Sequence, residues 1–124
     1  MIKLRKVPFL LIAGTAAWLA ACDNKSAAND PVPKLQTDPV AVERGKEIFV
    51  GTCGAYCHKM TDVQSDAPNL FDCTWLHGGS DQEIFNTISH GVPKTRMVPF
   101  GGALPDEDIW KIVAYLKSQS KCAQ

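Results

Sequence analysis

The chain has 124 residues, a hydrophobic fraction of 45% and a formal net charge of zero. This length allows one small domain, and the hydrophobic fraction excludes a wholly disordered chain. The balanced charge argues against a nucleic-acid-binding protein, which would carry a basic excess. The five cysteines need individual explanations, because an odd number leaves at least one without a disulfide partner in an exported protein.

The N-terminal segment has the pattern of an export signal. Three basic residues within positions 1–6 precede an apolar run, residues 7–21, that contains no charged residue. The run is shorter than the roughly 20 residues of a membrane-spanning helix, and the small residues at its end are typical of a cleavage site. We therefore expect residues 1–21 to be a signal peptide and not a buried helix.

The segment Leu19-Ala20-Ala21-Cys22 resembles the lipobox of bacterial lipoproteins, in which cleavage leaves a lipid-modified cysteine at the new N-terminus. The resemblance implies lipidation of Cys22, and Asp23 resembles the inner-membrane retention signal of many Gram-negative bacteria. Acyl chains at about 0.8 kcal/mol per buried CH₂ would form a firm anchor. Cleavage removes three basic residues and leaves ten against 13 acidic ones, so the mature chain carries a net charge of −3.

Residues 22–38 are predominantly polar and contain two prolines, without hydrophobic periodicity. This composition predicts a lipid-anchored flexible tether, with a structured arm over its last residues as the alternative. The folded domain would then be residues 39–124. A domain of this size needs reinforcement by a disulfide, a metal or a cofactor.

Three helices are predicted in this domain, and no long segment alternates like a strand. The first covers residues 40–51, with Asp38 and Pro39 as its N-terminal signal. The second covers residues 81–90 and ends at Gly91. The third runs from near Pro105 to about Gln119, with acidic residues in its first turn and lysines at its other end, as the helix dipole favours. The predicted fold class is all-α with extended loops.

The segment Cys53-Gly54-Ala55-Tyr56-Cys57-His58 carries the most informative chemistry. Two thiols followed by an imidazole are typical of covalent haem attachment, for which the usual signature is C-x-x-C-H. Here three residues separate the cysteines, so the motif alone leaves two alternatives open. One is a Cys53–Cys57 disulfide, and the other is a zinc site completed by His77, His90 or Cys73.

The segments around this motif resemble class I cytochromes c. Gly45-x-x-x-Phe49-x-x-x-Cys53 is similar to the N-terminal helix of that family, and Ala67-Pro68-Asn69-Leu70 is similar to its Pro-x-Leu segment. Residues 91–100 resemble its distal Met loop, and residues 106–116 its C-terminal helix. The resemblance covers about residues 40–120 and implies a small class I cytochrome c fold, with three main helices around one covalently bound haem c.

The resemblance also implies roles for individual residues. Cys53 and Cys57 would bond to the haem vinyl groups, and His58 would be an axial ligand of the iron. The carbonyl group of Pro68 would accept a hydrogen bond from His58 and so fix its tautomer.

Met97 is the implied sixth ligand, because it lies in the distal loop and far enough along the chain to reach the other haem face. Met60 is only two residues from His58 and can hardly reach that face. Bis-histidine ligation through His77 or His90 is the alternative, although His77 is better placed to meet a haem propionate or solvent. His/Met ligation raises the reduction potential, because a thioether favours Fe(II).

Cys73 and Cys122 are the two cysteines that remain after lipid and haem have been assigned. Because an exported protein folds in an oxidising compartment, this even number predicts a Cys73–Cys122 disulfide, and two free buried thiols are the alternative. The bond would hold residues 71–75 against the end of the C-terminal helix. The chain-entropy treatment gives about 4 kcal/mol for such a loop, as an upper figure.

The functional prediction is a periplasmic one-electron carrier, anchored by lipid to the inner membrane, monomeric and not an enzyme. With both axial positions filled, no open site is left for a substrate. Family use suggests a quinoprotein dehydrogenase as donor, for which the chain could serve as cytochrome subunit, and a terminal oxidase or another cytochrome as acceptor. The alternatives are a haem-based ligand sensor or peroxidase-like enzyme with a displaceable distal ligand, and a non-haem lipoprotein held by disulfides.

Overall fold

The computed structural model describes residues 29–60, 65–120 and 122. The predicted signal peptide and the lipidation site at Cys22 lie outside these residues. In chain order the helices are α2 (Val32–Gln36), α3 (Pro39–Ile48), the π-helix η1 (Phe49–Gly54), α4 (Asp81–His90) and α5 (Asp106–Gln119). Within the described part, β-structure is limited to one isolated bridge, so the all-α prediction is confirmed. None of the helices described is long and apolar enough to cross a membrane.

Helix α3 begins where the sequence predicts. The side chain of Asp38 accepts hydrogen bonds from the backbone N–H groups of Val40 at 2.9 Å and Ala41 at 3.3 Å, and Pro39 occupies the first turn. A capping carboxylate satisfies N–H groups that have no partner within the helix. The predicted helix over residues 40–51 differs at its other end, because the chain widens into η1 from Phe49 onward.

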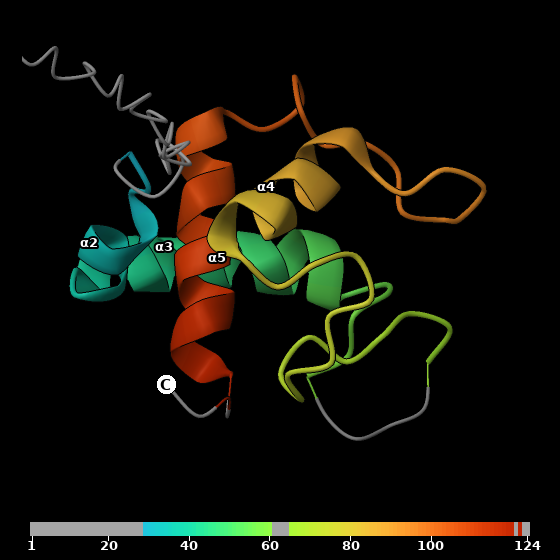
Figure 1. Cartoon of the computed structure of the whole chain (residues 1–124), viewed down its shortest axis with the longest axis horizontal. Helices are drawn as coiled ribbons and strands as arrows, with labels where there is room; N and C mark the ends of the chain where they lie inside the picture. Colours follow the sequence, from blue (N-terminus) through green and yellow to red (C-terminus); the bar gives the residue numbers. More distant parts are fainter. Residues whose placement is uncertain (1–28, 61–64, 121, 123–124) are drawn as a thin grey trace, which may run out of the picture.

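The crossing of α3 and α5 is the centre of the fold (Figure 1). Gly45 lies at this crossing, where a β carbon would stand 2.0 Å from the carbonyl oxygen of Lys111. Only glycine allows the two backbones to approach so closely. One turn later, Phe49 is fully buried and its ring centroid lies 5.7 Å from that of Tyr115. The Gly45-x-x-x-Phe49 pattern therefore joins the two helices.

Helix α4 has strong local signals at both ends. Ser80 accepts a hydrogen bond from the backbone N–H of Glu83, whose carboxylate accepts one from the N–H of Ser80 at 3.0 Å. This reciprocal arrangement is a capping box. At the other end Gly91 adopts a positive φ of 67°, which favours glycine. The predicted bounds of this helix are confirmed.

Helix α4 packs against α5 through aromatic and apolar side chains. Phe85 stacks on Trp110 with ring centroids 4.2 Å apart. The ammonium group of Lys117, near the end of α5, donates to the carbonyl oxygen of Gly79 at 3.0 Å and lies 3.4 Å from the carboxylate of Asp81. Burial raises the pKa of that carboxyl group, and the neighbouring Lys117 opposes the shift.

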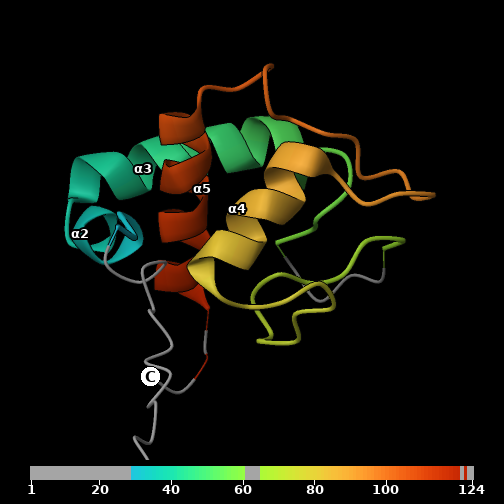
Figure 2. The ribbon, with the colours of Figure 1, turned by 45° about the horizontal axis from the view of Figure 1, so that its top comes forward.

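The last part of the predicted tether is folded. Val32 in α2 is fully buried and Leu35 packs against the same core, and the carboxylate of Asp30 accepts a hydrogen bond from the N–H of Val32 at 2.9 Å. Figure 2 shows α2 beneath α3 and beside α5. Residues 32–36 are thus packed against the core, as in the alternative of a structured arm over the last residues of the tether. A five-residue helix is too short to show hydrophobic periodicity in sequence.

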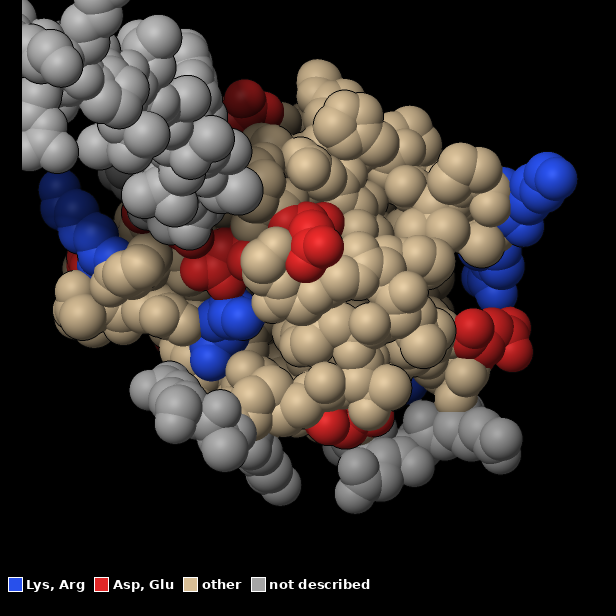
Figure 3. Space-filling view, viewed as in Figure 1, with Lys and Arg blue, Asp and Glu red and all other residues tan. Residues whose placement is uncertain are grey.

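Two long loops project to the same side of the helices, at the right in Figures 1 and 2. We call residues 65–80 the proximal loop and residues 91–100 the distal loop. Arg96 of the distal loop forms an exposed ion pair with Asp66 of the proximal loop at 3.3 Å. On the face shown in Figure 3, uncharged residues cover most of the area, and basic side chains with an acidic neighbour lie at the edge on the loop side. The buried core beneath the loops consists of Val32, Ile48, Phe49, Ile84, Ile88, Ile109, Ile112, Val113, Ala114, Tyr115 and Leu116.

Candidate functional site

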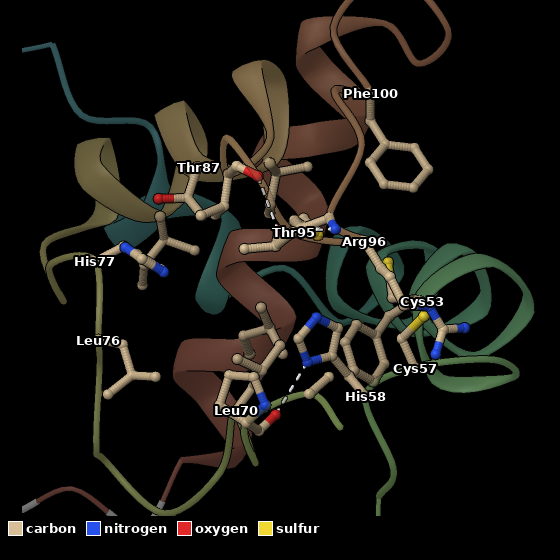
Figure 4. A pocket seen from close by; sticks show the side chains of 18 of the residues that line it. Cys53, Cys57, His58, Leu70, Leu76, His77, Thr87, Thr95, Arg96 and Phe100 are labelled. Atoms are coloured by element: carbon tan, nitrogen blue, oxygen red, sulfur yellow. Dashed lines mark hydrogen bonds between the residues drawn. The ribbon is translucent and has the colours of Figure 1, made fainter. Parts of the chain in front are cut away.

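A cavity of about 720 Å³ lies between the two loops and the helices. Small-molecule and cofactor sites are typically clefts of about 300–1,000 Å³ with predominantly apolar walls and a few polar groups. The cavity is lined from the 53–58 segment, both loops, α4 and α5. Cys53, Cys57, His58, Pro68 and Met97 all line it, so the fold brings together the five residues that the sequence assigns to haem. Figure 4 shows Cys53, Cys57 and His58 among them.

His58 is held in a defined orientation. Its side chain is nearly buried, with 9% exposed, and its Nδ1 lies 3.0 Å from the carbonyl oxygen of Pro68. A carbonyl can only accept, so Nδ1 carries the proton and donates. The other ring nitrogen, Nε2, then has a free lone pair for a metal ion. This is the contact that the resemblance implies for Pro68.

The extra residue of the attachment motif is accommodated by a wide turn. The carbonyl oxygen of Cys53 accepts hydrogen bonds from the N–H of Cys57 at 3.1 Å and from that of His58 at 2.9 Å. The second bond spans five residues, which is the spacing of a π-helix, and it continues the π-helical η1. In a C-x-x-C-H motif the same histidine would be four residues away. The insertion therefore changes the turn and leaves the N–H of His58 bonded to Cys53.

Both motif cysteines have free, half-buried thiols. Burial raises the pKa of the Cys53 thiol to about 11, with a further contribution from Cys57. Figure 4 shows the two side chains at the same end of the cavity, on the segment that leads to His58. The structure thus disagrees with a Cys53–Cys57 disulfide and leaves both sulfurs available for bonding to a group in the cavity.

Met97 enters the site from the distal loop, whose backbone is tied to the end of α4. The N–H of Val92 donates to the carbonyl oxygen of Met97 at 2.9 Å, and the hydroxyl of Thr95 accepts from the N–H of Met97 at 3.1 Å. Gly91 lies so close behind the loop that a β carbon there would be 2.5 Å from the Met97 carbonyl oxygen. The sequence analysis did not identify Thr95. A threonine hydroxyl commonly accepts a hydrogen bond from the backbone N–H two residues later in a turn, so Thr95 could have been found as a residue that shapes the loop around Met97.

The rival ligands are less well placed. Met60 is 49% exposed and does not line the cavity. His90 lies on the exposed side of α4, where its Nδ1 is 2.9 Å from the carbonyl oxygen of Asn86. His77 does line the cavity. Among the residues described, no three His, Cys, Asp or Glu side chains are grouped to hold a metal ion, which argues against zinc.

Cys73 and Cys122 are joined by a disulfide, with their Cα atoms 5.4 Å apart. The bond connects the proximal loop to the chain just beyond α5. Cys73 has a positive φ of 69°, which is uncommon for a residue with a β carbon. Neither sulfur is therefore free for a zinc site.

Comparison with known proteins identifies this arrangement. Residues 40–116 match the sequence family described as cytochrome c oxidase, cbb3-type, subunit III. The chain belongs to this family of c-type cytochromes. It is 40% identical to the cbb3-type cytochrome c oxidase subunit FixP of Sinorhizobium medicae (strain WSM419), over 69% of this chain and 32% of that one. It is 35% identical to the subunit CcoP of Rubrivivax gelatinosus, over 74% and 30% of the two chains. The cytochrome thus spans about a third of the length of these relatives.

Solved structures agree with this assignment. Cytochrome cL from Methylophaga aminisulfidivorans MPT is similar with a TM-score of 0.61 and 26% identity, over 68% of this chain and 57% of that one. Cytochrome cL from Hyphomicrobium denitrificans has the same TM-score at 24% identity, over 74% and 53%, and supports the fold alone. The predicted class I cytochrome c fold is confirmed.

The residues present fit a covalently bound haem. Members of the cytochrome c family carry haem c, so the predicted cofactor is confirmed. The two free thiols stand at one end of the cavity, the imidazole has its Nδ1 already occupied, and a thioether comes from a separate loop. This donor set is the one that attaches and ligates a haem, which supplies a one-electron couple when bound.

Proposed function

We propose that this cytochrome is a periplasmic one-electron carrier with covalently attached haem c and His58 and Met97 as axial ligands. The observation that carries the proposal is the imidazole of His58, held by the Pro68 carbonyl in a cavity that also contains Met97 and two free thiols. The relatives FixP and CcoP are subunits of cbb3-type cytochrome c oxidases, which supports electron transfer as the role.

The proposed mechanism needs fixed ligands and no substrate site. His58 presents Nε2 because its Nδ1–H is donated to Pro68. Met97 presents a thioether from a loop whose backbone bonds limit its movement, and this ligand favours the reduced iron and raises the potential. The protein thus contributes orientation, a set potential and a docking surface.

Covalent attachment is tested by the intact mass of the denatured protein. The wild type retains one haem, and replacing both Cys53 and Cys57 by alanine abolishes this retention. The matched control is the double replacement of Cys73 and Cys122, which removes as many sulfurs and leaves the haem bound. A wild-type chain without covalent haem would refute the proposal and favour the non-haem lipoprotein.

Axial ligation is tested by absorption spectra of the oxidised protein. A charge-transfer band between methionine and Fe(III) is expected in the wild type, is lost in Met97→Ala and is kept in Met60→Ala. Ready binding of carbon monoxide by a wild type without this band would instead favour the ligand-sensor or peroxidase-like alternative.

An apolar rim around the cavity is the proposed docking surface. Tyr56, Leu76 and Val98 are 77%, 68% and 56% exposed and all line the cavity. Such a rim suits brief contact with a redox protein, here a terminal oxidase as acceptor and a periplasmic dehydrogenase, such as a quinoprotein, as donor. Tyr56→Ser is expected to slow electron transfer to a cbb3-type oxidase. Val40→Ser is the control, because Val40 is 76% exposed but does not line the cavity; equal effects of the two variants would contradict the assignment.

The proposed location is the periplasmic side of the inner membrane, through a lipid at Cys22. A lipid anchor would keep this small carrier close to membrane-bound acceptors. Cys22→Ser is expected to release the domain from membranes or to block its maturation. Retention of a correctly cleaved variant in the membrane fraction would refute the anchor without affecting the haem assignment.

A further inference from the structure

The proximal loop forms a wall of the haem cavity without any helix or strand of its own. Two short turns shape it, in which Asn69 and Asp72 accept hydrogen bonds from backbone N–H groups two residues ahead, at 2.8 and 2.9 Å. These bonds are internal to the loop and do not fix it to the rest of the molecule. The loop residues that line the cavity include Leu70, Thr74, Trp75, Leu76 and His77.

Noncovalent contacts attach the proximal loop to the helices both before and after Cys73. Phe71 packs edge-on against Phe49 with ring centroids 5.7 Å apart, and against Tyr115 at 6.2 Å. At the far end, Gly79 accepts the hydrogen bond from Lys117. Between these two attachments Trp75 is partly buried and packs against the core, whereas Thr74, Leu76 and His77 are exposed. Cys73 lies directly before this stretch.

The disulfide adds a covalent attachment directly before these wall residues. Cys73 has a positive φ of 69°, a conformation that the chain rarely selects for a residue with a β carbon. A covalent bond to Cys122 can hold the backbone in this conformation. Helix α5 is largely buried, and the disulfide connects the loop to the chain just beyond this helix.

Cys122 lies outside the lining of the haem cavity, which makes it the better residue for testing the disulfide. It is not among the residues that line the cavity, whereas Thr74 and Trp75, next to its bonded partner, are. The bond to Cys73 is therefore the direct covalent link between Cys122 and these wall residues. The same argument does not hold for Cys73, whose replacement also changes the loop directly.

We propose that the Cys73–Cys122 disulfide is a positioning device for the haem-cavity wall, and that it helps to set the midpoint potential by limiting the access of water. This inference rests on the proposed haem site. Loss of the bond would let the wall residues 74–77 move away from the cavity. Water entering there would stabilise the more highly charged Fe(III) form, and the potential would fall.

The bond also makes the potential responsive to thiols. A small dithiol reductant would transfer two electrons and two protons to the disulfide, leaving Cys73 and Cys122 as thiols and itself becoming a cyclic disulfide. Both cysteines are only half-buried, so such a reductant has access. A carrier with an open bond would then be a poorer electron acceptor than one with a closed bond.

The test is the midpoint potential of the holoprotein, measured by spectroelectrochemical titration for Cys122→Ala, Cys73→Ala and the double variant. We expect each to shift the potential downward, and the shift of the double variant to equal that of Cys73→Ala, because the bond can be lost only once and both variants share the direct change in the loop. Val32→Ala is the control for lowered stability, since Val32 is buried in α2 and does not line the cavity; its potential should match the wild type.

A second measurement covers variants that fail to fold. Folded wild-type holoprotein is treated with dithiothreitol, alkylated with iodoacetamide, freed of reagents and titrated, with a sample alkylated without reduction as control. A lowered potential in the reduced sample, with two added alkyl groups by mass, supports the proposal. An unchanged potential despite two alkyl groups, or single-variant shifts that add in the double variant, would overturn it. Absence of covalent haem from the wild type is a separate result, which refutes the proposed function itself.

Discussion

Replacing Gly45 by alanine tests the central helix crossing. The added β carbon would lie 2.0 Å from the carbonyl oxygen of Lys111 and 2.5 Å from its carbonyl carbon, whereas ordinary contact begins at 3.4 Å. Both opposing atoms belong to the backbone of α5, so the helices would have to separate locally by about 1.4 Å. Overpacking of this kind costs about 1–3 kcal/mol, occasionally more. The better helix propensity of alanine returns up to about 1 kcal/mol, so we expect a net loss of about 2 kcal/mol.

The assay is reversible chemical and thermal unfolding of the holoprotein, followed by circular dichroism. A loss of about 2 kcal/mol corresponds to a fall of about 8–16 °C in Tm for a domain of this size. Gly51→Ala is the matched control, because Gly51 is also helical and a β carbon there meets no atom within 4 Å. It should be neutral or slightly stabilising. Equal stabilities of the two variants would refute the close crossing of α3 and α5.

Three further predictions concern α4 and the loop that follows it. Gly91→Ala should displace the distal loop, because it combines a φ of 67° with a β carbon 2.5 Å from the carbonyl oxygen of Met97; the expected result is a weakened methionine–Fe(III) band together with a lower Tm. Ser80→Ala removes the capping box and should lower the free energy of unfolding by about 1 kcal/mol in denaturant titrations at neutral pH. The hydrogen bond from Ser80 lowers the pKa of Glu83 below its ordinary value of 4.5. A depressed folded-state pKa contributes stability above the unfolded value and loses it as the pH falls through the folded value, so the difference between wild type and Ser80→Ala should shrink below about pH 4.5.

The helices were predictable where their signals are local. Helix α4 has the bounds that the sequence indicates, because the capping residues Ser80 and Gly91 are adjacent in sequence to the two ends of the helix. Helix α5 ends at Gln119 as expected and begins with three acidic residues in its first turn. The residues of the proposed haem site could be selected from the sequence for another reason: a short motif and its flanking segments resemble one family in the same order along the chain.

The features that sequence reasoning missed depend on contacts between distant segments. Helix α2 has only five residues and is stabilised by the burial of Val32 against α5, which no local pattern reveals. Isolated helices of this length are unstable in water, so tertiary packing decides whether such a segment folds. The shape of the cavity wall could not be predicted for the same reason, since Cys73, with a φ of 69°, is bonded to a residue 49 positions away in the sequence.

The extra residue between the two cysteines of the motif is compatible with the contacts that Phe49 and His58 make on either side of it. The chain widens into a π-helix at Phe49, before the first cysteine, and the carbonyl oxygen of Cys53 then accepts from both Cys57 and His58. Phe49 stays in the core and the imidazole of His58 still meets the carbonyl of Pro68. An inserted residue in a helix is commonly absorbed in this way, as a π-type turn near a functional site. The wide turn, which extends from Phe49 to His58, therefore accommodates the extra residue while both the core contact of Phe49 and the contact of His58 with Pro68 are made.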